Sequence, residues 1–295
     1  MDIDPARAAE VAALYGCRAF TGISELAGQA DAAIVAVPTS AHADIGCSLL
    51  EAGLDMLVEK PIAADVASAD HLIETAARRG RILQVGHLER FNPAVEALEK
   101  RVTLPLFFEI HRLNLFSARA LDVDVVLDLM IHDLDIVLSF VDSHVTEVRA
   151  VGLPILSGKT DIANARIEFA SGCVANFTAS RVSTERIRKL RFFQPQQYIS
   201  IDYSRQDVLA FTVGGDIGQP VTPSVNPQIG MVKPPVTAEE PLHAELKAFL
   251  DAVRRRKTPG VPLEDGRRAL SLALDVVDQI HRHGEKIDLE KLANR

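Results

Sequence analysis

Three residues whose side chains can handle protons stand out in this chain of 295 residues. Lys60 follows the apolar run 54–58 almost directly, between Glu59 and Pro61. A lysine at the end of a buried strand can hydrogen-bond a substrate hydroxyl, and burial lowers the pKa of an amine towards a useful range. The alternative is a surface lysine that pairs with Glu59.

Asp128 and His132 lie four residues apart in a stretch, 124–141, that is predicted to be helical. Their side chains should therefore share one helix face. A carboxylate beside an imidazole orients the ring and raises its pKa, so that the histidine can accept a proton. Asp133 and Asp135 add charge to the same apolar segment, which favours a ligand nearby. The alternative is a core histidine with satisfied hydrogen bonds.

Two further groups of polar residues could contact a substrate. The segment 86–93 follows a predicted strand and offers His87, Glu89 and Arg90, although it could equally be a polar linker between domains. Arg181 and Arg186 form a basic cluster that could bind a phosphorylated or nucleotide-linked substrate. Such clusters are more often solvated strand edges.

The first part of the chain predicts a parallel sheet. Apolar runs at 32–37, 54–58 and 82–86 indicate buried strands, and helical patterns at 40–53 and 66–79 separate them. Strands that alternate with helices at this spacing are typical of right-handed crossover units. A helix from Pro5 to Gly16, capped by Asp4, and a small strand at 17–20 precede them. We therefore predict a dinucleotide-binding domain over residues 1–90.

Residues 91–295 have a different pattern, which predicts an α+β domain for substrate binding and oligomerisation. Helices are expected at 92–100, 124–141, 241–256 and 264–283, and a long loop at 213–240. Strands are expected at 106–113, 145–151, 163–169, 173–180, 190–193 and 198–203. Several strands in succession favour a largely antiparallel sheet.

Composition excludes several functions. The net charge of -8 and the pI near 5.6 argue against a nucleic acid or an anionic membrane as partner. No apolar run is long enough to cross a bilayer. The three cysteines are scattered and have no metal-ligand spacing, so we expect no metal site and reduced thiols in a cytoplasmic protein.

Candidate cofactor contacts come from the position of residues in the predicted sheet. In a dinucleotide-binding fold, an acidic residue after the second strand binds the adenosine ribose and favours NAD over NADP. Asp2 would hold that place if a strand preceded it. His42 lies near a helix start, after Pro38 and Thr39, where anions and ribose-phosphate groups are favoured. The alternatives are a solvated aspartate and simple capping by Ser40.

The sequence AAIVAVPTSAHADIGCSLLEAGLDMLVEKP, residues 32–61, resembles the core signature of the Gfo/Idh/MocA oxidoreductases. The resemblance continues through VGHLERFNPA, DLMIHDLDI and the closing helices. It implies a Rossmann domain followed by an α+β domain with a large, mostly antiparallel sheet, which often builds a homodimer or homotetramer. It also implies hydride transfer between a nicotinamide cofactor and a hydroxyl-bearing carbon of a sugar, nucleotide sugar or cyclitol.

The resemblance assigns roles by position. It implies that Lys60 binds the reacting hydroxyl, that His132 is the acid/base, and that Asp128 orients the substrate. It places Glu59 and Lys60 at the cofactor and implies a Lys60-Pro61 peptide that is often cis. The segments GHLERFNPA and DLMIHDLDI are most similar to a branch that acts on nucleotide sugars, including the UDP-N-acetylglucosamine 3-dehydrogenases. Two alternatives are an NAD-using glycoside hydrolase of the same family and a non-catalytic sugar-binding regulator.

The sequence departs from the family at its start. Family members open with a strand, a Gly-x-Gly-x-x-Gly turn that holds the pyrophosphate, and a helix, and this sequence begins after them. We therefore expect a Rossmann-type domain that is incomplete at its N-terminus, of low stability and with little affinity for NAD. Tight NAD binding by these 295 residues, measured by calorimetry, would contradict that expectation.

Overall fold

The computed structural model describes residues 1–99, 101–117, 123–213 and 229–286. By packing, the chain forms two compact units, and each is described by itself. The first comprises Met1–Gly86 with Leu246–Arg267, and the second comprises His87–Glu245 with Arg268–Arg295. The assignment of residues 1–90 to the cofactor and 91–295 to the substrate stays a prediction.

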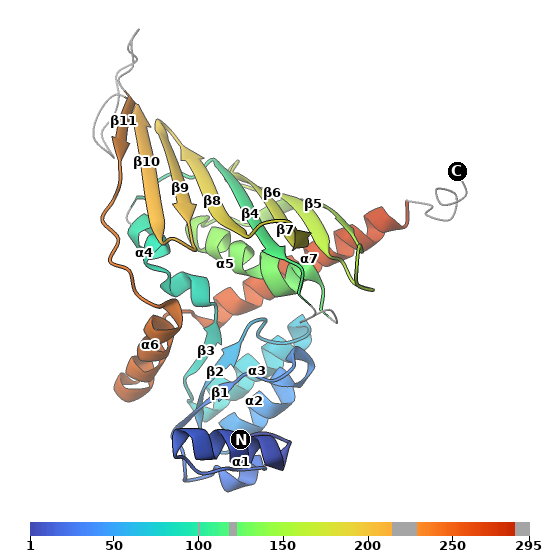
Figure 1. Cartoon of the computed structure of the whole chain (residues 1–295), viewed down its shortest axis with the longest axis vertical. Helices are drawn as coiled ribbons and strands as arrows, with labels where there is room; N and C mark the ends of the chain where they lie inside the picture. Colours follow the sequence, from blue (N-terminus) through green and yellow to red (C-terminus); the bar gives the residue numbers. More distant parts are fainter. Residues whose placement is uncertain (100, 118–122, 214–228, 287–295) are drawn as a thin grey trace. The chain divides into compact units, whose positions relative to one another are not determined.

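The first unit contains a parallel sheet of three strands in the order β1-β2-β3 (Figure 1). The strands are β1 (Ala32–Val35), β2 (Asp55–Glu59) and β3 (Leu83–Gly86). The helices are α1 (Pro5–Tyr15), α2 (His42–Glu51) and α3 (Val66–Arg79), with short 3-10 turns η1 (Ile23–Glu25) and η2 (Thr39–Ala41). This confirms the predicted strand–helix alternation. The predicted strand at 17–20 is wrong, because those residues pair with no strand in the described part of the chain.

The start of helix α7 packs tightly on β3 within this unit. A Cβ added at Gly266 would lie 2.6 Å from Cγ2 of Val85, whose side chain is fully buried. We expect Gly266→Ala to lower the free energy of unfolding by about 1–3 kcal/mol, because a buried β-branched neighbour has little room to move. Combining it with Val85→Ala should recover part of the loss. Urea unfolding of the two single variants and the double variant checks this, and additive effects would contradict it.

The second unit is built on an eight-stranded sheet in the order β11-β10-β9-β8-β4-β7-β6-β5. Its strands are β4 (Phe107–Leu115), β5 (Val145–Leu153), β6 (Ile162–Phe169), β7 (Val174–Ser183), β8 (Ile187–Gln194), β9 (Gln197–Asp202), β10 (Asp207–Val213) and β11 (Ile229–Val232). Among the described strands of this sheet, only β4 and β7 pair in parallel, so the prediction of a largely antiparallel sheet is confirmed. Strand β11 lies inside the predicted loop 213–240, and residues 214–228 of that loop lie outside the described residues. All four residues of β11 are exposed, so the sequence has no alternating burial pattern that would predict this strand. It is a strand because it pairs with β10.

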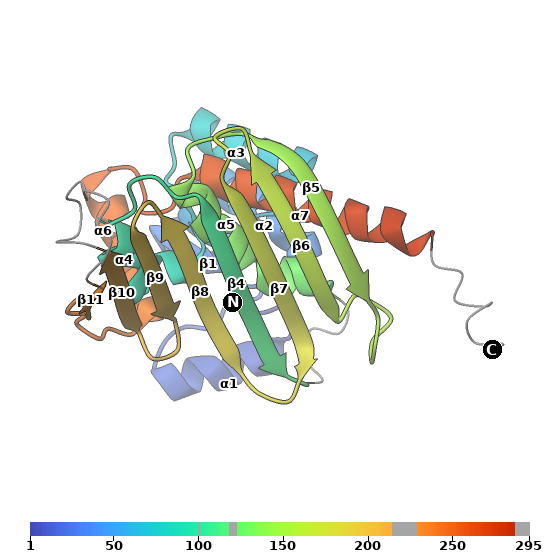
Figure 2. The same cartoon turned by 90° about the horizontal axis from the view of Figure 1, so that it is seen from above.

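Helices cover one face of this sheet. They are η3 (Leu88–Phe91), α4 (Pro93–Glu99), a π-helical turn η4 (Val126–Met130), α5 (Ile131–Phe140) and the part of α7 (Leu263–Gly284) that belongs to this unit. Helix α6 (Pro241–Arg255), like α7, belongs partly to both units. Figure 2 shows α4, α5 and α7 on the same side of the sheet. Inward side chains such as Phe108, Phe177 and Phe192 pack there against Leu134 and Val137, which forms the core of the unit.

The opposite face of the sheet carries no helix in Figure 2. Four aromatic rings form a row across it, from Phe107 through Phe193 and Tyr198 to Phe211. Successive ring centroids are 5.7, 4.9 and 5.5 Å apart. We call these four residues the aromatic row. Among the described residues, no helix is both long enough and apolar enough to span a membrane.

Candidate active site

Lys60 lies just beyond the carboxyl end of β2, the edge at which doubly wound sheets bind their ligands. Its side chain is half-buried. The Lys60-Pro61 peptide bond is cis, as the family resemblance implies. Glu59 is the last residue of β2 and lies opposite Gly86, the last residue of β3. Thr39 opens the turn η2 that follows β1, while Pro38 before it is exposed.

His42 is buried, and both of its ring nitrogens face backbone carbonyls. Nδ1 lies 2.8 Å from the oxygen of Pro61, and Nε2 lies 2.9 Å from the oxygen of Val37. The ring therefore links the chain that leaves β1 to the chain that leaves β2, next to Lys60. The predicted contact of His42 with the cofactor stays a prediction.

Asp2 lies in no strand and interacts with the start of helix α1. Its Oδ1 accepts a hydrogen bond from the N–H of Asp4 at 3.0 Å, and its Oδ2 lies 3.6 Å from Nε of Arg7. Asp4 in turn caps the helix by accepting from the N–H of Ala6. The ribose contact predicted for Asp2 is not tested by these contacts and stays a prediction.

Asp128 and His132 come from two kinds of helix. Asp128 lies in the π-helical turn η4, and His132 lies in the first turn of α5. Both side chains are half-buried, while Val126, Met130 and Ile131 between and beside them are buried. The helix predicted over 124–141 is present, but it begins as a π-turn. Such turns occur frequently at functional sites, because a widened turn redirects the side chains around it.

Helix α5 is held through the two aspartates that follow His132. Arg112 on β4 donates two hydrogen bonds to Asp133, from Nε at 2.7 Å and from Nη2 at 2.8 Å. Arg90 on η3 binds Asp135 in the same bidentate way, at 2.6 and 2.9 Å. We call these two pairs the α5 clamp. Asp133 and Asp135 are both fully buried, so neither carboxylate is screened by water.

The predicted contacts of the segment 86–93 lie around this clamp. His87 is buried, with Nδ1 3.9 Å from Oδ2 of Asp135. Glu89 is also buried and accepts a hydrogen bond from Nη1 of Arg112 at 2.9 Å. Asn92 donates to Glu89 at 3.2 Å. The roles predicted for His87, Glu89 and Arg90 in substrate binding stay predictions.

The charges in this cluster perturb one another. Burial alone would lower the pKa of Arg112, but the carboxylates of Asp133 and Glu89 outweigh it and hold that pKa well above its ordinary value. Burial raises the pKa of the Asp133 carboxyl, and the Arg112 guanidinium opposes the rise. Burial and the charge of Asp133 raise the pKa of Tyr203, whose ring stacks under the Arg112 guanidinium at 5.3 Å.

Sequence reasoning missed Arg112 and Tyr203. A signal for Arg112 exists, because Phe108, Ile110 and Arg112 alternate along β4 and therefore point to the same, buried face. An arginine at an inward position needs a buried carboxylate partner, and the sequence offers several. Tyr203 carries the same signal, because it continues the alternation of Ile199 and Ile201 and is buried as they are.

The two arginines predicted to bind phosphate occupy different environments. Arg181 on β7 is only 5% exposed; its Nη2 donates to the carbonyl of Val123, and its Nε lies 3.8 Å from Oδ1 of Asp161. Arg186 is exposed in the turn between β7 and β8. The structure therefore does not bring the two side chains into one exposed cluster, and their contact with a substrate stays a prediction.

Asp161, beside Arg181, organises the loop before β6. Its Oδ2 accepts hydrogen bonds from the N–H groups of Ile155, Leu156 and Ser157 at 2.8, 2.6 and 2.8 Å. The Ser157 hydroxyl donates to Oδ1 at 2.6 Å. Burial alone would raise the pKa of Asp161, but these hydrogen bonds outweigh it and hold the pKa well below its ordinary value.

This lowered pKa predicts a pH dependence of stability. The stabilisation from Asp161 is complete above the unfolded-state pKa near 4 and is lost as pH falls through the lower folded-state pKa. We expect Asp161→Asn to cost about 2–3 kcal/mol at pH 7, since it removes hydrogen bonds to a charged acceptor. Urea unfolding at pH 7 and pH 3 should show a smaller difference for the variant than for the wild type, and equal differences would contradict the prediction.

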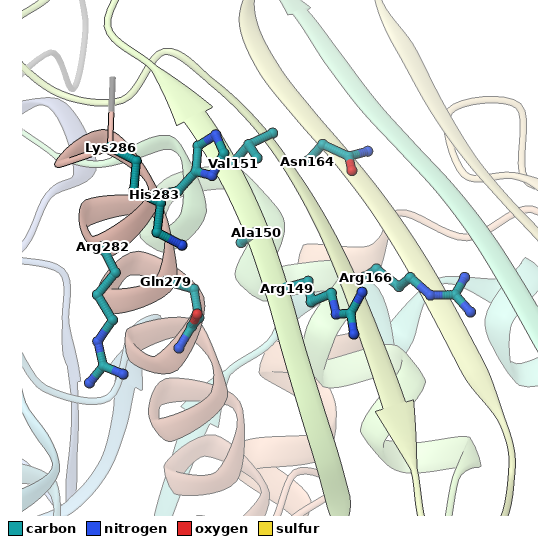
Figure 3. Close-up of a pocket in the computed structure, with 9 residues that line it drawn as sticks. All are labelled: Arg149, Ala150, Val151, Asn164, Arg166, Gln279, Arg282, His283 and Lys286. Carbon is teal, nitrogen blue, oxygen red and sulfur yellow. The ribbon is translucent and has the colours of Figure 1, made fainter. Parts of the chain in front are cut away.

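Two open clefts lie away from these residues. One, of about 460 Å³, lies beside β5 and the end of α7, where Arg149, Arg166, Arg282, His283 and Lys286 gather (Figure 3). Three of its cations already lie against carboxylates, namely Arg149 with Glu147, Arg166 with Glu168 and Arg282 with Asp278. The other, of about 470 Å³, lies at the amino ends of β1 and β2. Neither cleft includes a residue that the sequence predicts for the site.

The residues at the carboxyl edge of the three-stranded sheet fit part of a nicotinamide dinucleotide site. Thr39, Glu59 and Lys60 all follow or end strands at the edge where such cofactors bind. The printed sequence contains no Gly-x-Gly-x-x-Gly turn, so we assign no residue to the pyrophosphate.

Comparison with known proteins supplies the family. Residues 1–87 match the family described as "Oxidoreductase family, NAD-binding Rossmann fold", and residues 107–199 match "GFO/IDH/MocA C-terminal domain". UDP-N-acetylglucosamine 3-dehydrogenase from Acidithiobacillus ferrooxidans is 36% identical over 277 residues, which cover 93% of this chain and 87% of that protein. Its solved structure has a TM-score of 0.86 at 34% identity and covers 94% of this chain and 87% of that one.

A cyclitol enzyme is also related. The scyllo-inositol 2-dehydrogenase (NAD(+)) of Bacillus subtilis is 29% identical over 168 residues, which cover 52% of this chain and 49% of that protein. The family matches to residues 1–87 and 107–199, and the relative that aligns along nearly the whole chain, agree with the parallel and antiparallel sheets described above. The chain therefore belongs to the Gfo/Idh/MocA family of NAD-binding oxidoreductases.

Proposed function

We propose that this protein is a cytoplasmic dehydrogenase that oxidises a hydroxyl-bearing carbon of a nucleotide sugar with NAD. The observation that carries the proposal is the local setting of three residues whose side chains can handle protons. Lys60 follows a strand at the ligand-binding edge, and Asp128 and His132 lie at a π-turn and the helix after it. The 36% identity to UDP-N-acetylglucosamine 3-dehydrogenase favours a nucleotide sugar over a free sugar or cyclitol.

The proposed roles follow from side-chain chemistry. Lys60 donates a hydrogen bond to the reacting hydroxyl and stabilises the developing alkoxide. His132 accepts the hydroxyl proton, and Asp128 orients the substrate beside it. NAD, when bound, supplies the carbon that accepts the hydride. Lys60 belongs to the first unit and the other two residues to the second, so these roles rest on the family assignment and on the local setting of each residue.

Spectrophotometry at 340 nm tests this proposal. With NAD⁺ at saturating concentration, which allows for a low affinity, and UDP-N-acetylglucosamine, the protein should form NADH, and free N-acetylglucosamine and myo-inositol should react more slowly. A glycoside hydrolase of the same family would use NAD transiently and release UDP or sugar without net NADH. Product analysis by mass spectrometry separates these two outcomes, and the absence of both would favour a sugar-binding regulator.

We further propose that the protein forms a homodimer or homotetramer through the helix-free face of the eight-stranded sheet. The aromatic row supports this proposal, since exposed rings are enriched in protein interfaces. Phe193 is 38% exposed at the middle of the row. A second copy of the same face would bury these rings by two-fold symmetry.

A charge in the aromatic row should therefore break the assembly. We expect Phe193→Asp to shift the molar mass from an oligomer to a monomer, because an unpaired carboxylate would be buried in the interface. Light scattering after size exclusion measures the mass. Leu14→Asp, at an exposed position on α1, is the matched control and should leave the mass unchanged. A wild-type protein that is already monomeric at micromolar concentration would refute the proposal.

A further inference from the structure

We propose that Arg112 and Arg90 are positioning residues. They fix the rotation of α5 about its axis and its position along that axis, and so present His132 to the substrate. They do this by holding Asp133 and Asp135, the two carboxylates of the α5 clamp. The inference rests on the proposed function, because the position of His132 matters for catalysis only if His132 handles the proton.

The geometry of the clamp fixes a helix at two sides. Each guanidinium binds its carboxylate through two parallel hydrogen bonds, which constrain orientation as well as distance. Asp133 and Asp135 are two positions apart, so they project roughly 200° apart around a helix with 3.6 residues per turn. A helix held at nearly opposite sides cannot rotate without breaking one pair. A slip by one residue would turn His132 by roughly 100°.

The arginines are themselves immobilised by the segment that the sequence marked as GHLERFNPA. The third guanidinium nitrogen of Arg112, Nη1, donates a hydrogen bond to Glu89, and the guanidinium stacks on the ring of Tyr203. Asn92 ties Glu89 to the backbone carbonyl of Tyr203, with hydrogen bonds of 3.2 and 3.1 Å. Arg90 comes from the same segment, in η3. The polar residues of this segment thus connect strand β4 and the end of β9 to the catalytic helix.

Helix α5 has a structural need for such a clamp. It starts directly after the π-turn η4, and no side chain caps its first residue. The junction is bonded locally through its backbone, since the N–H of Ile131 donates to the carbonyl of Val126 with the wider spacing of a π-turn. The clamp adds side-chain contacts that favour this register over the ordinary α-helical one.

Stability alone does not account for the buried charges. Replacing a buried ion pair with apolar side chains of similar volume is often neutral or stabilising. Arg112, Asp133 and Glu89 are all at most 7% exposed, so their charges carry the full desolvation cost. Directional bonds supply a defined geometry, which apolar packing does not.

Arg112→Lys is the primary test, because it keeps the charge and removes the bidentate bond. We expect the melting temperature to change by only a few degrees, while amide hydrogen exchange in residues 131–140 rises at least about tenfold. The imidazole NMR signal of His132, assigned with His132→Gln, should shift or broaden. For an active enzyme, kcat should fall about 10–100-fold with KM for NAD unchanged, since small misplacements of a catalytic group have effects of this size. Arg78→Lys is the matched control, because Arg78 pairs with Glu51 on the surface at 2.7 Å.

A charge-free variant covers the case in which Arg112→Lys fails to fold. The triple change Arg112→Met, Asp133→Leu and Glu89→Gln should fold, and it should still show fast exchange in 131–140 and a lowered kcat. The proposal would be overturned if either folded variant had the amide exchange rates of the wild type and an unchanged His132 signal. It would also be overturned if neither variant folded, because the cluster would then be a requirement for folding only. If the wild type forms no NADH, the proposed function fails, whereas the exchange and NMR results still decide the role of the clamp.

Discussion

Replacing His132 with glutamine is expected to lower kcat by about 10²–10⁴-fold, the range that removal of a general acid or base produces. Glutamine has similar length and polarity but cannot accept the hydroxyl proton at neutral pH. Because His132 is half-buried near the start of α5, the melting temperature should change little. Steady-state NADH formation with NAD⁺ and UDP-N-acetylglucosamine measures the effect.

We also expect Lys60→Met, in the first unit, to lower kcat. The substitution removes the ammonium group and with it a hydrogen bond to the developing alkoxide. Two matched controls use the same substitutions at exposed positions of the helices, His71→Gln on α3 and Lys247→Met on α6. Both controls should retain activity within about twofold. If His132→Gln and Lys60→Met retained activity as well as the controls do, the assignment of these two residues would be wrong.

Arg112→Met should have the largest effect on stability of any single change considered. The substitution leaves Asp133 and Glu89 buried without their cation, and breaking a buried ion pair from one side costs about 3–5 kcal/mol. Much of that cost is the unpaired carboxylates, so it should shrink at low pH as they are protonated. Chemical unfolding at pH 7 and pH 5 measures both effects.

A variant that also lacks the two unpaired carboxylates is the control for this prediction. Adding Asp133→Leu and Glu89→Gln to Arg112→Met should recover most of the lost free energy of unfolding, because the two carboxylates that lost their cation are then gone as well. A triple variant as unstable as the single one would show that the packing of Arg112 over Tyr203, and not its charge, dominates.

Patterns of period two and 3.6 were sufficient to predict most of the fold. The strands β1, β2 and β3 are short apolar runs between helices, and β6 and β7 alternate inward and outward residues over most of their length. Local patterns failed where pairing alone makes a strand, as in β11, and where β-forming residues find no partner, as at 17–20. The π-turn at Val126–Met130 was also invisible, because its residues carry an ordinary helical pattern.

The sequence by itself determined which groups can do chemistry, since Lys60, Asp128 and His132 are defined by residue type and by their places after a strand and along a helix. Only the tertiary structure decided how the neighbouring charges are used. By residue type, any of four charged residues could have met a substrate, namely Glu89, Arg90, Asp133 and Asp135. The structure instead pairs Arg90 with Asp135. It places Arg112, which lies more than twenty residues away in the sequence, between Glu89 and Asp133. The reason is physical: a buried charge must find its partner in space, and sequence patterns report which face a residue occupies but not which residue it meets there.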